Sequence, residues 1–381
     1  MLEKKAMSTA RGTLAITGAG LVSSLGADVE LVCAAARAGI TQTTDGEFAA
    51  RDVQAEAMVP VTVHTVGALT QGFAELGRWV RLGSLALRDL LRRVPAGGME
   101  RTAVLINLPS DYLLRAAHQR QGHPVSGQPV PYEAVQPWYR AEYVRRLLRA
   151  AGISTSPAVQ EVFFEDQAGI VTLLRTATEL LRTGRVTRCL VGGVDSLLEP
   201  RWLEACNTLR ILKTATHPVG LMPGEGAAFL LLEETERARR EEHRVLATVE
   251  GLNLQHDGAH RFASPPPDGR VLSEVIRASL RQAPEPCLGL YGDLNGDGVR
   301  SQDWGMALVK LRQEYTPASL TLPALYFGET RAAHGFIAAS MATQAFARGY
   351  HASESLLVWA ASDNGAKGSF TLTRHTARGM T

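Results

Sequence analysis

Cysteine and histidine are the residues in this sequence best suited to act as nucleophiles, acid–base groups or metal ligands. The cysteines lie far apart and none forms a Cys-x-x-Cys pair, so neither a zinc site nor a disulfide framework is predicted; they are Cys33, Cys189, Cys206 and Cys287. His334 follows Glu329 by about one helical turn, a spacing that would suit an acid–base pair with Glu329 or with Asp297. No nucleophile accompanies His334, so we interpret it as a satisfied or solvent-facing histidine. His118 and His123 flank a Gln- and Gly-rich segment without a third ligand, so no metal site is predicted there.

The composition indicates a folded protein without bulk affinity for nucleic acid or membranes. Of 381 residues, 45% are hydrophobic and 20% are charged, which excludes disorder. The net charge is 40 − 38 = +2, too small to attract nucleic acid or an anionic membrane. No apolar run approaches the ~18–20 residues that span a bilayer. The absence of a disulfide framework fits a reducing compartment, and the start, MLEKKAMSTARGT, lacks a signal peptide's apolar stretch, so we expect a cytoplasmic protein. Met7 is a second candidate start.

Apolar runs alternate with helical patterns along the chain. In the clearest helix, residues 168–182, the apolar residues repeat at i, i+3, i+4 and i+7. The charged stretch 233–244 separates two similar series, so we predict two halves, residues 8–235 and 245–375, with largely parallel sheets. The elements predicted in the second half are strands at 246–253, 288–293, 324–327, 356–360 and 369–372 and helices at 271–282, 304–313 and 332–348.

Four short segments stand in an order that resembles one enzyme family. They are the Gly-rich opening at 14–26, the Val-Gly-Gly-Val strand at 190–196, the Pro-Gly-Glu-Gly segment at 223–233 and the Pro-Asp-Gly loop at 264–269. Together they resemble the β-ketoacyl synthases, condensing enzymes of the thiolase fold. The resemblance implies an α/β fold with duplicated βαβαβαββ halves and two stacked sheets in a five-layer αβαβα arrangement. The Gly-rich opening alone would also suit a dinucleotide-binding fold, but the third glycine and the acidic residue of that motif are missing.

The family's catalytic positions carry other residues here. In the family, a cysteine at a helix N-terminus holds the acyl chain as a thioester, two histidines assist decarboxylation of malonyl thioester, and a lysine orders the site. The matching positions are Gln167, Asn295 and Glu329, with Ala324 at the lysine position. A glutamine amide cannot form a thioester. The loop that completes the family's oxyanion hole is also replaced, by residues 362–368.

These replacements predict a catalytically inactive ketosynthase-like protein in fatty acid or polyketide biosynthesis. It would act as a scaffold or partner subunit, forming a homodimer or a heterodimer with an active ketosynthase through residues 159–164, with acyl carrier protein or an acyl-thioester as a further ligand. Chain-length-factor subunits of the family carry glutamine at the nucleophile position and pair with an active synthase. No cofactor is expected. The alternative is a residual enzyme, such as a malonyl-carrier-protein decarboxylase or another acyltransferase of the family.

Carboxylates crowd the segments expected to converge on the family's pocket. They are Glu165, Asp166, Asp297, Glu329 and Asp363. Crowded carboxylates raise one another's pKa unless Arg331 or Lys367 compensates. We expect them to form a hydrogen-bonded plug rather than a new acid–base site. Cys206, which the resemblance puts near the acyl tunnel, is predicted to be a core residue.

Arginines recur on two predicted helices. Five lie between residues 76 and 94, and three more lie between residues 145 and 149. Such residues usually form a solvated helix face, and the alternative is a docking surface for acyl carrier protein.

Overall fold

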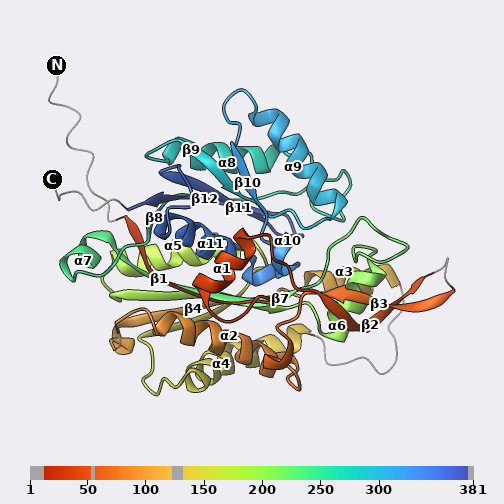
Figure 1. Ribbon diagram of the computed structural model, residues 1–381, viewed down its shortest axis with the longest axis horizontal. Helices are drawn as coiled ribbons and strands as arrows, with labels where there is room; N and C mark the ends of the chain where they lie inside the picture. The colour runs from red at the N-terminus through yellow and green to blue at the C-terminus, as the bar shows by residue number, and fades with distance from the viewer. Residues whose placement is uncertain (1–12, 53–55, 96, 122–131, 376–381) are drawn as a thin grey trace.

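The strands form one large sheet and one small hairpin in the computed structural model, which describes residues 13–52, 56–95, 97–121 and 132–375 (Figure 1). The strands are β1 (Leu14–Val22), β2 (Thr44–Asp52), β3 (Ala57–Val63), β4 (Thr102–Leu108), β5 (Val159–Phe164), β6 (Arg188–Ser196), β7 (Glu225–Glu234), β8 (Ala247–His256), β9 (Cys287–Tyr291), β10 (Ser319–Thr321), β11 (Ser355–Ala361) and β12 (Ala366–Arg374). The helices are α1 (Val29–Arg37), α2 (Glu75–Leu91), α3 (Tyr112–Gln121), α4 (Tyr132–Ala151), α5 (Gly169–Arg182), α6 (Pro200–Thr208), α7 (Thr235–Arg240), α8 (Arg270–Gln282), α9 (Gly298–Leu311), α10 (Ala324–Phe327) and α11 (His334–Ala347).

The sheet repeats one strand order in its two halves. The first half runs β5-β4-β6-β7-β1 and the second runs β10-β9-β11-β12-β8. In both halves the first two pairings are parallel and the last two are antiparallel. The duplication predicted from the sequence is therefore confirmed, whereas the exact boundaries at residues 235 and 245 stay a prediction.

Five layers of structure are visible in Figure 1. Helices α5 and α11 lie between the two halves of the sheet, α2 and α4 cover the outside of the first half, and α8 and α9 cover the outside of the second. The five-layer prediction is confirmed, with one difference in the sheets. Instead of two separate sheets, the halves form one continuous ten-stranded sheet, because the start of β1 also pairs with β8 at Leu14↔Val249, Ala15↔Thr248 and Ile16↔Ala247.

Helix α11 lies at the centre of these layers and is buried on every side. Its sequence, HGFIAASMATQAFA, has no charged face, as a helix enclosed by other elements requires. Gly335 at its start allows close packing against α5, since a Cβ there would lie 2.5 Å from Cγ2 of Ile170. This contact holds together the starts of α5 and α11, which border the site described below.

One predicted strand in the second half is wrong. Residues 324–327 form the single helical turn α10, and the strand of this region is β10, at Ser319–Thr321. A four-residue apolar run fits a strand or a buried helical turn equally well, so periodicity could not decide. The helix predicted at 304–313 begins earlier, at Gly298, because Asp297 caps it by accepting a hydrogen bond from the Arg300 N–H at 3.1 Å. None of the helices in the described ranges has both the length and the apolar composition needed to cross a bilayer.

Candidate functional site

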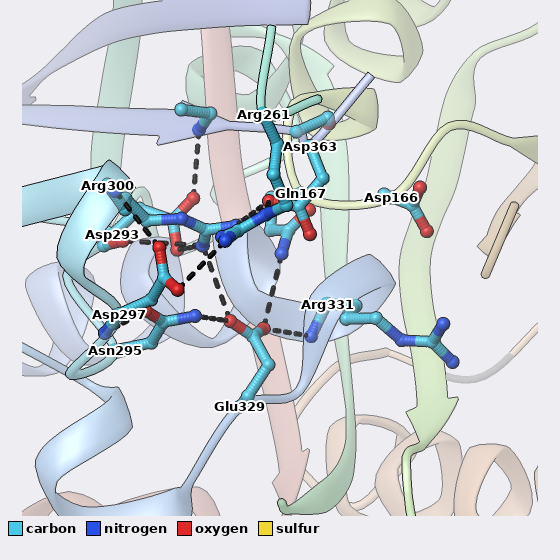
Figure 2. A network of polar contacts seen from close by, with 12 residues as sticks. Asp166, Gln167, Arg261, Asp293, Asn295, Asp297, Arg300, Glu329, Arg331 and Asp363 are labelled. Atoms are coloured by element: carbon cyan, nitrogen blue, oxygen red, sulfur yellow. Dashed lines mark hydrogen bonds and ion pairs between the residues drawn. The ribbon is translucent and has the colours of Figure 1, made fainter. Parts of the chain in front are cut away.

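Glu329 lies at the centre of a buried polar cluster, with 1% of its surface exposed (Figure 2). Its Oε1 accepts hydrogen bonds from Gln167 Nε2 at 3.3 Å and from the Arg331 backbone N–H at 2.6 Å. Its Oε2 accepts hydrogen bonds from Asn295 Nδ2 at 2.5 Å and from Arg300 Nη1 at 3.3 Å. The three positions matched to the family's catalytic residues therefore meet in space, and each oxygen of the carboxylate has two donors.

Both halves of the chain supply this cluster. Gln167 stands just before α5, where the chain turns out of β5 through Asp166 at a positive φ of 46°. Asn295 comes from the loop between β9 and α9, and Glu329 follows α10. The backbone of Glu329 is held by the segment before β7, because its N–H donates to the Met222 carbonyl at 2.7 Å. The site is thus fixed by loops at the ends of strands from both halves.

Arg300 is the main cation of the cluster and is fully buried at the start of α9. Its Nη1 lies 2.8 Å from Asp293 Oδ1 and its Nη2 lies 3.0 Å from Asp363 Oδ1, besides the contact with Glu329. Arg261 is the second cation, bonded to Asp297 at 2.8 Å and to Asp363 at 2.9 Å. These two guanidinium groups are shared among four carboxylates, those of Asp293, Asp297, Glu329 and Asp363.

Arg331 and Lys367, the two cations considered as compensation for the crowded carboxylates, form their own ion pairs with other acids. Figure 2 shows that Arg331 reaches Glu329 only through its backbone, while its guanidinium points away. That guanidinium donates to Asp195 at 2.9 Å, and Lys367 Nζ bonds to Asp303 at 2.5 Å. The sequence did not reveal Arg261 and Arg300, because all the acidic partners of their guanidinium groups except Asp293 lie 29 to 102 residues away.

The carboxylate plug forms with only some of its expected members. Asp297, Glu329 and Asp363 belong to it, and Asp293, at the end of the strand predicted over 288–293, was missed. Glu165 and Asp166 turn away from it. Glu165 accepts a hydrogen bond from Thr172 Oγ1 at 2.5 Å, and Asp166 accepts one from the Ser110 N–H at 2.9 Å.

The arginines set the ionisation of the plug. Burial alone would raise the pKa of Asp363, but the charges of Arg261 and Arg300 outweigh burial and hold it well below its usual range. The pKa of Asp297 is lowered in the same way, against burial, by its hydrogen bond to Arg261. Burial dominates at Asp293, whose pKa is raised despite Arg300. Asp297 and Asp363 are therefore held in the ionised form, whereas Asp293 binds a proton more readily.

His334 is buried rather than solvent-facing, with 1% of its surface exposed. Its Nε2 lies 3.4 Å from Asp293 Oδ1, so its acidic neighbour is neither Asp297 nor Glu329, which the sequence suggested. Neither ring nitrogen has a hydrogen-bond partner among the described residues. The interpretation as a satisfied or solvent-facing histidine is therefore wrong.

The cysteines are buried, and none of them bonds to Glu329. Burial raises the pKa of each of the four thiols to about 12, which keeps them protonated. Cys206 lies in the core on α6, as predicted.

His123 lies outside the described residues, so the prediction that no metal binds there is untested. Within the described residues, the side chains of Glu233, Glu241 and His243 lie close enough together to hold a metal ion. They lie near the C-terminal end of β7, whereas Glu329 bonds to the segment before its N-terminal end.

The arginines in and just after α2 bond within the protein, while Arg88, Arg92 and Arg93 remain exposed to solvent. The partners are the Glu225 carboxylate for Arg78, the Leu69 carbonyl for Arg81, the Ala150 carbonyl for Arg88, the Ala27 carbonyl for Arg92, and Asp28 and Asp89 for Arg93. On α4, Arg145 and Arg146 both bond to Glu142. The α2 arginines link that helix to its neighbours, whereas the two α4 arginines bond within their own helix.

Comparison with known proteins identifies the relatives of this chain. The model for the β-ketoacyl synthase N-terminal domain matches residues 168–238. The chain is 34% identical over 151 residues to the tetracenomycin polyketide synthase ketoacyl synthase beta subunit of Streptomyces glaucescens. It is 30% identical over 139 residues to the alpha subunit of the same synthase. The matched segments are about a third of each chain: 35% of this one and 36% of the beta subunit, and 33% and 32% for the alpha subunit.

Solved structures resemble the whole chain. The ishigamide ketosynthase/chain length factor superposes with a TM-score of 0.71 at 18% identity, covering 96% of this chain and 100% of the other. A type II PKS acyl-carrier protein complex with its ketosynthase superposes with a TM-score of 0.74 at 14% identity, covering 96% and 99%. These likenesses show the thiolase-like fold.

Proposed function

We propose that this chain, whose ketoacyl synthase domain is homologous to both tetracenomycin subunits, is a non-condensing partner subunit of a polyketide ketosynthase. The proposal rests on one observation, that both oxygens of the Glu329 carboxylate accept hydrogen bonds from donors within the protein. Gln167, Asn295, Arg300 and the Arg331 backbone satisfy it completely, at positions where condensation would need a thiol and two free imidazoles.

Condensation fails at its first step in this arrangement. The acyl chain has to be transferred to a nucleophile, and the amide of Gln167 cannot replace a thiolate. The four cysteine thiols cannot substitute for it, because all are buried and their pKa is raised to about 12.

A residual decarboxylase or another acyltransferase is the alternative activity. Decarboxylation of a malonyl thioester needs donors that stabilise the enolate oxygen as charge develops on it. The amide donors of Gln167 and Asn295 already bond to Glu329, whose negative charge would also oppose an enolate. The geometry therefore argues against this alternative.

The partner surface that we propose is the free edge of β5. This strand ends the first half of the sheet, and its Gln160 and Glu161 are exposed. An exposed edge offers backbone groups to a strand of another chain. A homodimer, or a heterodimer with an active ketosynthase, would bury it. Acyl carrier protein is a further proposed partner, for which the exposed arginines near α2 and on α4 are the candidate docking surface.

Light scattering on the purified protein tests the partner role. We expect a dimer of twice 41.1 kDa, or a stable complex with a co-expressed active ketosynthase, with an interface above the ~1,600 Å² of a standard specific complex. A monomer at micromolar concentration that retains no ketosynthase would contradict the proposal. A cytoplasmic location stays a prediction.

A further inference from the structure

A histidine and two glutamates meet where the two halves of the chain join. Glu233 lies near the end of β7, and Glu241 and His243 lie between α7 and β8. One carboxylate oxygen from each glutamate and a ring nitrogen of His243 all lie within 4.8 Å of one another. Cysteine and histidine spacing in the sequence does not reveal this group, because two of its three members are glutamates. Nothing in the proposed function uses it.

The separations of these atoms suit a transition-metal ion. Glu233 Oε2 lies 2.8 Å from His243 Nδ1, and Glu241 Oε2 lies 3.9 Å from the same nitrogen. Zinc binds nitrogen and carboxylate oxygen at about 2.0–2.2 Å, so two ligands of a tetrahedral site stand about 3.4 Å apart. The side chain of Glu241 is 40% exposed, so it is free to make the small rotation that the remaining difference requires.

Each carboxylate has one oxygen held by a residue outside the group and the other oxygen near His243. Glu233 Oε1 accepts a hydrogen bond from Thr17 Oγ1 at 2.8 Å, and Glu241 Oε1 lies 2.6 Å from Arg237 Nη2. Thr17 is available for this contact because it stands at a bulge in β1 and has no opposite residue on β7. Outer partners of this kind orient the carboxylates that bind metal ions.

The carboxylate of Glu233 needs a positive partner because it is buried, with 1% of its surface exposed. Across the part of the chain that the structure describes, no arginine or lysine nitrogen lies within ion-pair distance of it, and His243 is its one basic neighbour. Buried charges in proteins are paired or coordinate metal ions. A divalent cation shared with Glu241 and His243 supplies the positive charge that a neutral imidazole lacks.

The turn that carries Glu241 and His243 is fixed by backbone hydrogen bonds. The His243 N–H donates to the Ala238 carbonyl at 2.8 Å, and the Glu242 N–H donates to the Arg239 carbonyl at 3.2 Å. This pair of bonds, with Glu242 at a positive φ of 56°, is the Schellman ending of a helix. Both ligands on the turn are therefore in place before a metal ion arrives, which lowers the entropic cost of binding.

We propose that Glu233, Glu241 and His243 bind a zinc ion, with water as the fourth ligand. The imidazole nitrogen favours a transition metal over magnesium or calcium, which prefer oxygen ligands. The ion links the turn after α7 to the end of β7 and, through Thr17, to β1, the strand that pairs with both halves of the sheet. Its role is to stabilise the junction of the two halves.

Isothermal titration of the whole chain with zinc chloride tests the proposal. We expect one site with a Kd of about 10 μM or tighter, and a rise in Tm of about 3 °C when free zinc exceeds the Kd about 100-fold. Magnesium and calcium should each bind at least about tenfold more weakly than zinc. Glu241→Gln and His243→Gln should each weaken zinc binding at least about tenfold, because each removes a ligand.

Glu242→Gln is the matched control, because Glu242 is an exposed glutamate next to Glu241 and outside the group. His217→Gln is the control for zinc held by other histidines. Both controls should leave the Kd for zinc unchanged, and thermal unfolding without zinc will show that all the variants fold. The proposal is overturned if the wild-type protein binds no zinc up to about 1 mM, if either Glu241→Gln or His243→Gln binds zinc as tightly as wild type, or if magnesium binds as tightly as zinc.

Discussion

The side chains of Gln167, Asn295 and Glu329 fit one another chemically. A carboxylate accepts hydrogen bonds and donates none when ionised, so it needs donors on every side. Gln167 and Asn295 are amides whose NH₂ groups supply such donors, at 3.3 and 2.5 Å. The glutamine, asparagine and glutamate are therefore chemically matched to one another.

A thiol introduced at residue 167 should react slowly. In Gln167→Cys the thiol would stand before α5, where the helix dipole favours the thiolate, but it would also be buried beside the Glu329 carboxylate. A full negative charge and burial should outweigh a half charge and raise the pKa of the new thiol above the ~8.5 of a free cysteine. We expect slow alkylation by iodoacetamide, followed by mass spectrometry.

Two further variants separate charge from burial at this position. Adding Glu329→Gln to Gln167→Cys removes the carboxylate and keeps its shape, so alkylation should accelerate. Adding Asn295→His and Glu329→His should accelerate it further and permit acylation by thioesters. If Gln167→Cys alone acylates as readily as an intact ketosynthase, the site is open and the plug interpretation is wrong.

Arg300 should be the most costly side chain of the cluster to remove. Arg300→Met keeps most of the volume but leaves three buried carboxylates without their shared cation. We expect a loss of about 3–5 kcal/mol in the free energy of unfolding, measured by urea denaturation. Arg277→Met breaks the more exposed ion pair with Glu314 and should cost less than about 1 kcal/mol. Equal costs for the two variants would contradict the central role of Arg300.

Sequence reasoning located the centre of the site and missed its surroundings. Gln167, Asn295 and Glu329 were predicted to converge because each lies in a segment with a recognisable pattern. Arg261 and Arg300 carry no such pattern, since their partners are chosen by tertiary packing across loops far apart in the chain. Asp293 could have been recognised as a site residue, because it stands at the end of the strand predicted over 288–293.

At the scale of elements, β5 and β10 occupy equivalent places, each at one end of the sheet. A proline blocks pairing with another chain, so it distinguishes the two edges. We expect Gln160→Pro in β5 to convert the dimer to monomer in light scattering. Leu320→Pro in β10 is the matched control and should leave the dimer intact, with circular dichroism confirming that both variants fold. Dissociation by the β10 variant alone would move the interface away from β5.

The elements also show where pattern alone fails. The apolar strand β11 and the amphipathic helix α5 were predicted close to their observed bounds, at 356–360 and at 168–182. The run at 324–327 was too short for its period to be read, and it folds as the turn α10 directly before Glu329. The β2–β3 hairpin was missed because its strands, with sequences TDGEFAARD and AMVPVTV, carry a weak alternating pattern.

At the scale of the whole molecule, the thiolase-like fold encloses a site where residues 167, 295 and 329 are glutamine, asparagine and glutamate. The duplicated sheet, the central helices and the convergence of loops from both halves are all present. A fold is stabilised by its core, whereas activity depends on a few side chains. The core of this chain does not depend on a thiol or an imidazole at residues 167, 295 and 329.

The most direct test of the non-condensing role is to incubate the purified protein with malonyl-carrier protein and an acyl-carrier protein donor. Carbon dioxide release, β-ketoacyl product and any acyl adduct on the chain should be followed by mass spectrometry. We expect no product, no adduct and no decarboxylation above the background without protein, because Gln167, Asn295 and Glu329 supply neither a nucleophile nor free imidazoles. Turnover above that background that disappears in Gln167→Ala would contradict this account.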